Sequence, residues 1–423
     1  MRTRPTLLRA LALAVLPALA VAACTAAGTG SPDSDGQATG SGAARTVSSG
    51  PLVVVGATLP LSGPLAAYGL PLQAGYQQDI TDVNAAGGIA VGGRKERLKL
   101  VVLNNASSPA AASAQASELV RRDHAVALLG SATAQIVTPT ALIAEQLHVP
   151  FLTSLMPVQA FASGDKAGWT YSWDLFYGEK QQAADVAKAL AAVPGSKKVA
   201  LFTDSEPDSV VERPLYAAAF RADGLDLVGD YTFPVGTTSF SAFIADARAN
   251  GAQLVAGQLD QADGVALWKQ LESSAFRPKS AFLAGASDGE SWWQSLGRLA
   301  QDSLSEGYWS PAQASPGQLA AISSTLGHKY AGSPDYETAA LAYAVAQVLT
   351  DALATAGSTS PGRLNTAISR TDARTTAGLI TFNRTTHTAL TPYYVTQWQN
   401  GKLVQVQPLA PGATFEVPAA GLG

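Results

Sequence analysis

The stretch that decides the fold runs from residue 52 to residue 88 and reads LVVVGATLPLSGPLAAYGLPLQAGYQQDITDVNAAGG. Residues 52–58 form a short β-branched run, which is typical of a buried strand. A loop rich in glycine and proline follows, and residues 71–86 have the pattern of a helix with Pro71 in its first turn. A strand, a loop and a helix in this order predict the first unit of a parallel sheet.

Strands and helices continue to alternate through most of the chain. Further strands are predicted at residues 98–104, 125–130, 150–153, 198–203, 225–232, 254–258 and 281–284. Further helices are predicted at residues 109–122, 134–147, 179–193, 210–223, 239–250 and 262–274. This rhythm is typical of parallel sheets that carry helices on both faces. We therefore expect an α/β protein with two doubly wound lobes.

The C-terminal part departs from this repetition. Two helices and three strands are predicted there, at residues 316–331, 335–356, 379–382, 393–397 and 403–406. Asn400 and Gly401 separate the last two strands, which indicates a hairpin. We expect these late segments to rejoin lobes that formed earlier in the chain.

Composition excludes several classes of function. The 423 residues include 28 Lys plus Arg and 32 Asp plus Glu, which gives a formal net charge of −4, and no long basic run is present. Nucleic-acid-binding proteins carry a basic footprint, so nucleic acid is not an expected partner. The single cysteine and the four scattered histidines have no metal-binding spacing, so no metal and no other cofactor is predicted.

The N-terminus has the features of an export signal. Arg2, Arg4 and Arg9 precede a 14-residue apolar run at residues 10–23. The run is too short to span a bilayer by itself and has the length of a signal-peptide core. We expect residues 1–23 to be a signal peptide that is removed from the mature protein.

The end of this run carries a motif of its own. Residues 21–24 read VAAC, which resembles the lipobox of bacterial lipoproteins, in which the cysteine becomes the lipid-modified first residue. The resemblance implies that Cys24 carries a lipid and that residues 24–50, which have almost no large apolar side chain, form a flexible linker. The alternative is an ordinary secreted protein with a chance cysteine near its cleavage site.

Two motifs of the body resemble a known family. Residues 59–69, LPLSGPLAAYG, follow the first strand, and residues 82–89, DVNAAGGI, close the first helix. At this spacing they resemble the amino-acid-binding receptors of branched-chain amino acid transporters, which have a type I periplasmic-binding-protein fold. Weaker similarities extend the resemblance to about residues 52–408, at residues 129–151, 306–308 and 378–397.

The resemblance implies two lobes with a ligand cleft between them. About three crossings are expected to join the lobes, near residues 172–175, 307–311 and 377–382. Lobe 1 is expected to hold residues 51–172 and 309–376, and lobe 2 residues 173–308 and 377–410, with a tail at 411–423. Because the carboxyl ends of strands face such a cleft, ligand contacts are expected in the loops that follow them.

The first of these loops contains Tyr68. The resemblance places this aromatic ring over the ligand, although a tyrosine at a loop tip is also a common partly buried anchor. Gly63 and Gly69 leave room for backbone amides to approach a ligand. The segment from Asn84 to Gly88, in contrast, favours a plain helix end followed by a turn.

Two later loops match those that hold the ligand carboxylate in the family. The candidate residues in them are Ser131, Thr133, Ala134, Ser154 and Leu155. Ala134 stands where the family has its first serine, and Pro157 stands where a threonine is expected. Proline supplies neither a hydroxyl nor an NH group, so a standard α-amino acid is not assured as the ligand.

Acidic residues follow the strands of the second lobe. Asp208, Asp260 and Asp288 are the candidates to pair with a cationic group of a ligand. The resemblance favours Asp288, which lies within about two residues of the family's amine-binding acid, whereas Asp260 falls where a tyrosine usually stands. Each acid is also open to interpretation as a solvated loop residue.

One pattern suggests an enzyme. Residues 285–289, GASDG, match the GxSxG nucleophile elbow between a strand and a helix, and Asp335 and His387 follow in the order that hydrolases use. The pattern arises readily by chance in a chain with 39 glycines, and no second oxyanion loop is present in the sequence.

The sequence therefore predicts a solute-binding lipoprotein and no enzyme. We expect a monomer on the outer face of the cell membrane, anchored there by lipid only, that binds a small polar solute such as an amino acid or a related amine or amide. The resemblance alone implies its partners, the membrane permease and the ATPase of an ABC importer. A ligand-binding sensor without transport is the main alternative, and a serine hydrolase is the lesser one.

Overall fold

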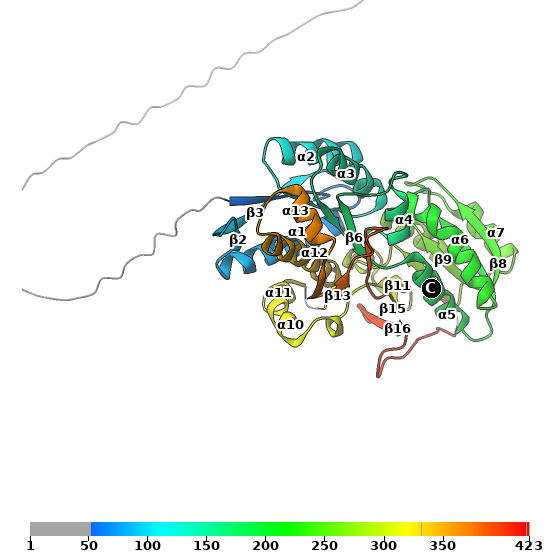
Figure 1. The fold of residues 1–423 in the computed structure, drawn as a ribbon. Helices are drawn as coiled ribbons and strands as arrows, with labels where there is room; N and C mark the ends of the chain where they lie inside the picture. The colour runs from blue at the N-terminus through cyan, green and yellow to red at the C-terminus, as the bar shows by residue number, and fades with distance from the viewer. Residues whose placement is uncertain (1–51, 331, 420, 423) are drawn as a thin grey trace, which may run out of the picture. The chain divides into compact units, whose positions relative to one another are not determined.

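The computed structural model describes residues 52–330, 332–419 and 421–422, which form two predominantly parallel sheets with helices packed against them (Figure 1). The predicted signal peptide, Cys24 and the whole of the predicted linker lie outside the described residues. The predicted fold class, α/β with two doubly wound sheets, is confirmed.

The first lobe contains a seven-stranded sheet with the order β14-β6-β5-β4-β1-β3-β2. Its strands are β1 (Leu52–Leu59), β2 (Ile89–Val91), β3 (Arg94–Asn104), β4 (Ala127–Leu129), β5 (Phe151–Thr153), β6 (Ser172–Phe176) and β14 (Thr388–Leu390). Its helices are α1 (Ala66–Ala85), α2 (Pro109–Arg121), α3 (Ala134–Leu147), α4 (Val158–Ser163), α10 (Pro316–Ser323), α11 (Leu326–Tyr330), α12 (Asp335–Ala356) and α13 (Pro361–Ile368). Apart from the antiparallel pair of β2 and β3, neighbouring strands are parallel. The winding reverses at β1, because the chain passes to β3 on one side and returns to β4 on the other.

The second lobe repeats this plan with the order β16-β15-β11-β10-β9-β7-β8. Its strands are β7 (Lys198–Thr203), β8 (Asp226–Thr232), β9 (Leu254–Gln258), β10 (Ser280–Ala284), β11 (Leu304–Gly307), β15 (Tyr394–Gln399) and β16 (Lys402–Gln407). Its helices are α5 (Glu179–Ala191), α6 (Pro207–Ala222), α7 (Ser241–Ala249), α8 (Gln261–Ser273) and α9 (Glu290–Leu296), with a 3₁₀ turn at Gly297–Ala300. The strands from β7 to β11 are parallel, β15 and β16 are antiparallel, and the winding reverses at β7.

The core of the first lobe depends on the close approach of α1 and α12, which lie side by side in Figure 1. A Cβ atom added at Gly75 of α1 would come within 2.6 Å of the Ala342 Cβ and would overlap the Ala339 carbonyl oxygen. Only glycine fits at this contact. α12 is long and apolar enough to cross a membrane, but 72% of its most apolar window is buried inside the protein, as in a core helix.

The lobe boundaries differ from those predicted from the sequence. β6 covers the first predicted crossing at residues 172–175, yet it pairs in parallel with β5 and belongs to the first sheet. β14 also joins the first sheet, although residues 377–410 were assigned to the second lobe. Strand pairing is a tertiary contact, so short apolar runs do not reveal their sheet. The chain crosses between the lobes at residues 177–178, 308–315 and 391–393.

Two further predictions concern the C-terminal region. β15 and β16 form the predicted hairpin, and Asn400 and Gly401 have φ values of 54° and 79° as a tight turn requires. The single helix predicted at residues 316–331 is instead divided into α10 and α11. Between them, the hydroxyls of Ser324 and Thr325 bond to backbone carbonyls of the preceding turn, and such bonds compete with the helix.

The segment predicted as a tail packs against the second lobe. The Gln397 side chain donates to the Glu416 carbonyl at 2.7 Å and accepts from the Glu416 NH at 2.9 Å. Leu422 is buried, and its NH donates to the Pro278 carbonyl at 2.8 Å. A small antiparallel sheet of β12 (Asp372–Thr375) and β13 (Gly378–Thr381) precedes β14.

Candidate functional site

A small cavity of about 50 Å³ lies between the two lobes. It is lined by Tyr68, Ala132, Thr133, Leu155, Pro157, Phe176, Tyr177, Asp208, Gln258, Gly285, Asp288, Glu306 and Tyr308. These residues end or follow parallel strands of both sheets. Doubly wound sheets bind ligands beyond the carboxyl ends of their strands, beside the point where the winding reverses, and the cavity occupies this place in each lobe.

Tyr68 reaches the cavity from the first turn of α1. This helix begins at Ala66, earlier than predicted, so that Pro71 lies inside it and not in its first turn. The start of α1 is set by Leu65, which is buried in a small apolar cluster with residues of α2 and α3. A tertiary contact therefore determines the helix start, and the position preferred by proline does not.

The first-lobe wall contains two residues with a left-handed backbone. Thr133 has a φ of 63° and Leu155 a φ of 57°, and the Thr133 NH donates to the Leu155 carbonyl at 3.1 Å. Branched side chains rarely adopt this conformation, and when they do the strain is often found at functional sites. The loops after β4 and β5 thus support one another where they meet the cavity.

The five candidates predicted in these loops separate into two groups. Thr133 and Leu155 line the cavity, whereas Ser131, Ala134 and Ser154 are fully buried and do not. Within the described residues, the hydroxyl oxygens of Ser131, Thr133 and Ser154 are buried without a hydrogen-bond partner. Ala134 is the first residue of α3, so its NH has no partner within the helix.

Two of the three predicted acids of the second lobe line the cavity. Asp208 lies in the first turn of α6, where it accepts from the Ser209 NH at 3.0 Å, and Asp288 lies between β10 and α9. Asp260 is half-buried and lies outside the cavity wall. Its NH donates to the Asp204 carboxylate at 2.7 Å, which places it behind the wall.

Glu306 was not predicted as a site residue. It is 4% exposed and accepts hydrogen bonds from the Gly285 NH at 2.9 Å and from the Tyr177 hydroxyl at 2.7 Å. Its strand, β11, reads LSEG, and this sequence has too few apolar residues to indicate a buried strand. Its main partner, Tyr177, stands 129 positions earlier in the chain, so the pairing could not be inferred from local patterns.

A tyrosine occurs in each of the three crossings: Tyr177, Tyr308 and Tyr393. The rings of Tyr177 and Tyr393 lie 4.8 Å apart between centroids, and Phe176 contacts both Tyr177 and Tyr308 at 4.2 and 5.1 Å. The crossings therefore form one aromatic cluster. Since Glu306 bonds to Tyr177, this cluster is connected directly to the cavity wall.

The lobes also touch across the cavity. The Tyr68 hydroxyl donates to the Gly285 carbonyl at 2.8 Å and lies 3.2 Å from a carboxylate oxygen of Asp288. Burial and the nearby Asp288 raise the pKa of Tyr68, so its hydroxyl stays protonated and able to donate at neutral pH.

The cavity wall carries three carboxyl groups and no basic side chain. Burial raises the pKa of Asp208 to about 6, and the charge of Asp204 adds to this shift. Burial also raises the pKa of Asp288 and of Glu306, and Asp288 is the main charge that raises the latter. Behind the wall, burial and neighbouring acids raise the pKa of Asp260 to about 7. The wall thus holds acids whose raised pKa values reflect the cost of burying their charge, and the residues that line it supply no counter-charge.

The three residues of the hydrolase hypothesis lie in different surroundings. Ser287 is fully buried, and its hydroxyl donates to the carbonyl of Leu283 at 2.6 Å. His387 lies in the turn before β14, on the other lobe, where its ring stacks on Trp173 with 3.8 Å between the ring centroids. Asp335 accepts from the Glu290 NH at 3.2 Å. The three residues of the hydrolase hypothesis therefore have separate structural partners.

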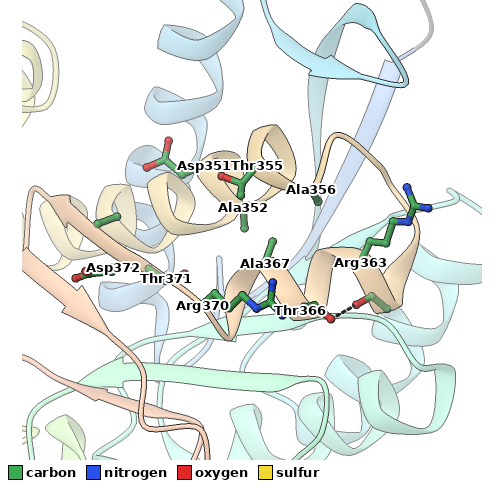
Figure 2. Close-up of a pocket in the computed structure, with 12 residues that line it drawn as sticks. Asp351, Ala352, Thr355, Ala356, Arg363, Thr366, Ala367, Arg370, Thr371 and Asp372 are labelled. Atoms are coloured by element: carbon green, nitrogen blue, oxygen red, sulfur yellow. Dashed lines mark hydrogen bonds between the residues drawn. The ribbon is translucent and has the colours of Figure 1, made fainter.

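A larger groove of about 500 Å³ lies between α12 and α13. Figure 2 shows Asp351 and Thr355 of α12 on one side of it and Ala367 and Arg370 on the other. It is lined by one lobe only, is mostly exposed, and lies away from the carboxyl ends of the strands. We therefore regard the smaller interlobe cavity as the candidate site.

Comparisons with known proteins agree with this architecture. The Leu/Ile/Val-binding protein homolog 3 of Brucella melitensis is 23% identical over 360 residues, which cover 84% of this chain and 94% of that protein. The crystal structure of the leucine-binding protein LivK from Thermotoga maritima superposes with a TM-score of 0.74 at 21% identity, covering 84% of this chain and 97% of that one.

A second solved structure is the branched-chain amino acid transporter substrate-binding protein LivJ from Streptococcus pneumoniae, in complex with isoleucine. It has a TM-score of 0.72 at 22% identity and covers 84% of this chain and 98% of that one. At such identities the structural similarity shows the fold. The family model for periplasmic binding proteins, in addition, matches residues 53–402. This chain therefore belongs to the periplasmic binding protein family.

Proposed function

We propose that this protein is the extracytoplasmic solute-binding component of an ABC-type importer and that it binds an amino acid or a related amine or amide between its lobes. The observation that carries the proposal is the interlobe cavity, which polar side chains from the strand ends of both sheets line. Membership of the periplasmic binding protein family supports it.

The two walls supply complementary groups to such a solute. On the first lobe, Tyr68, Thr133 and the first turn of α3 offer hydroxyl and NH donors, which suit a carboxylate or carbonyl oxygen. On the second lobe, Asp208 and Asp288 offer carboxylates, which suit an ammonium or amide NH group. Ser131, Ala134, Ser154 and Asp260 are proposed to support these contacts from behind the wall.

Binding is proposed to shift the protein toward a closed state. A solute that contacts both walls gains all of its interactions only when the lobes are together, so it stabilises the closed form relative to the open one. The three crossings, with their clustered tyrosines, are the segments about which the lobes would rotate. The closed form would then be recognised by the permease, and the ATPase would drive transport.

The membrane anchor is part of the same proposal. The VAAC motif at residues 21–24 supports lipid attachment at Cys24 and a position on the outer face of the cell membrane. The linker that follows would let a monomeric body reach its permease.

A thermal-shift screen of amino acids, amides, polyamines and aromatic acids tests solute binding, because a compound that binds only the folded state raises the unfolding midpoint. Uptake of the solute found in this way, measured in cells with and without the gene, then tests transport. Loss of uptake in the deletion strain is expected. If the protein binds the solute but deletion of the gene leaves uptake unchanged, a sensing role would be favoured over import.

A further inference from the structure

We propose that the cavity selects a small organic solute with two positively charged nitrogen groups, one paired with Asp208 and the other with Asp288 and Glu306. This inference rests on the proposed solute-binding function and names the class of solute that the site takes.

The carboxyl groups are spread along the edge of the second sheet. Asp208 follows β7, Gln258 ends β9, Asp288 follows β10, and Glu306 lies in β11, in the spatial order of these strands. Neighbouring strands lie about 4.8 Å apart, so the ends of β7 and β10, from which the segments of Asp208 and Asp288 leave, are about 10 Å apart. We call the acids from Asp208 to Glu306 the acidic row. A charged hydrogen bond is about 2.8 Å long, so a single ammonium group does not reach both ends of this row.

The opposite wall offers no compensating charge. Ala132, Leu155, Pro157 and Phe176 present apolar surface, and the polar groups on this side are hydroxyls. The salt bridges of the described residues involve other acids. Buried carboxylates without a cation are costly, and a dication in the cavity would relieve this cost at both ends of the row.

The cavity also continues beyond Asp288. A second space of about 10 Å³ shares Tyr68, Asp288 and Tyr308 with the first and is lined further on by Gln261 and Asp335. Acids thus stand on both sides of Asp288. This arrangement fits an elongated cation better than a compact one.

Polar atoms without partners point to the same place. Thr133 lines the cavity with its hydroxyl oxygen buried and unbonded, and one carboxylate oxygen of Glu206, a residue that is 5% exposed, is likewise unbonded within the described residues. Burial and then the nearby Asp208 raise the pKa of Glu206 to about 9. Thr133 therefore offers the solute a hydroxyl on the first-lobe wall, and Glu206 adds a further acid beside Asp208, outside the lining of the cavity.

Matched pairs of compounds test the proposal by calorimetry and thermal shift on the purified protein. Putrescine is compared with butylamine, and L-lysine with L-norleucine, because each pair differs by one amino group; L-leucine is the fifth compound. We expect the two-cation member of at least one pair to bind about tenfold or more tightly than its partner. Putrescine binding alone would identify a diamine, and lysine binding alone would identify a basic amino acid.

Variants locate the two ends of the row. Asp208→Asn and Asp288→Asn should each weaken binding of the preferred dication about tenfold, and Glu306→Gln should weaken it as well. The unliganded variants should melt at the same temperature as the wild type or higher, since each loses a buried carboxylate without a counter-charge. Asp226→Asn, an exposed acid at the opposite end of β8, is the control that should change neither binding nor midpoint.

Three results would overturn the proposal in distinguishable ways. Equal binding within both pairs, or tightest binding of L-leucine, would refute the selection of two cations and leave solute binding intact. No change of midpoint with any of the five compounds would refute it too, and the broader screen would then decide the proposed function. Unchanged dication binding in both aspartate variants would place the solute elsewhere.

Discussion

The Tyr68 hydroxyl donates a 2.8 Å hydrogen bond to the Gly285 carbonyl, and this contact joins the two lobes across the cavity. Tyr68 belongs to the first turn of α1 and Gly285 to the loop after β10, so the bond exists only while the lobes are close together. The same hydroxyl lies within 3.4 Å of both carboxylate oxygens of Asp288. A change at Tyr68 should therefore act on lobe closure before it acts on folding.

Tyr68→Phe removes this bond and keeps the ring. The loss of one partly buried hydrogen bond corresponds to about 1 kcal/mol, which should shift the balance of lobe arrangements toward the open one by about fivefold. Small-angle scattering should then show a larger radius of gyration for the variant. Tyr171→Phe, which removes a hydroxyl of the same lobe that forms no hydrogen bond with the described residues, should leave the scattering unchanged. Identical curves for all three proteins would show that the Tyr68 bond does not hold the lobes.

Ser287→Ala tests the hydrolase hypothesis. The Ser287 hydroxyl bonds to the carbonyls of Leu283 and Leu304 in the core, so its removal should lower the free energy of unfolding by about 1 kcal/mol. Solute affinity should stay within about threefold of the wild type. A fluorophosphonate probe should label neither the wild type nor the variant. Labelling of the wild type that disappears in the variant would support the hydrolase hypothesis.

Gly75→Ala tests the contact between α1 and α12. The added methyl group would overlap the Ala339 backbone, so overpacking should lower the free energy of unfolding by about 2 to 3 kcal/mol. Gly362→Ala is the matched control, because a Cβ on this glycine of α13 meets no other atom within 4 Å. The control should be neutral or stabilising by about 0.5 kcal/mol. Chemical denaturation of the two variants measures both values.

The unliganded protein should become less stable as the pH rises from 7 to 9. Burial raises the pKa of Glu206 to about 9 and that of Glu337 to about 8, whereas both groups are already ionised at neutral pH in the unfolded chain. The folded state therefore holds more protons in this range, and stability that is fully present below the unfolded pKa is lost as the pH passes through the folded values.

Thermal unfolding at several pH values measures this dependence. Glu206→Gln should reduce the slope, because it removes one of the titrating groups. A midpoint that rises between pH 7 and pH 9 would contradict the expectation.

Cys24→Ser tests the predicted anchor. Without the thiol no lipid can be attached, so the protein should be released or remain unprocessed, while the folded body is unaffected. Fractionation of cells and metabolic lipid labelling measure the two effects. A processed, lipid-labelled and membrane-bound Cys24→Ser protein would show that the lipoprotein assignment is wrong.

The sequence determined those features that depend on local patterns. The alternation of β-branched runs with helical stretches predicted the two doubly wound sheets, and Asn400 with Gly401 predicted the last hairpin, because these residues tolerate the positive φ angles of the turn. The family resemblance led to Tyr68 and favoured Asp288, and the rule that ligands bind beyond the carboxyl ends of strands led to Asp208. All three line the interlobe cavity.

Tertiary structure decided what depends on contacts between distant segments. The sheet to which β6 and β14 belong follows from strand pairing, and the start of α1 follows from the burial of Leu65. Glu306 joined the cavity wall through Tyr177 and Gly285, whereas Asp260 is not among the residues that line the cavity. Periodicity records which face of an element is apolar, but the partner that covers this face is chosen by the packing of the whole chain.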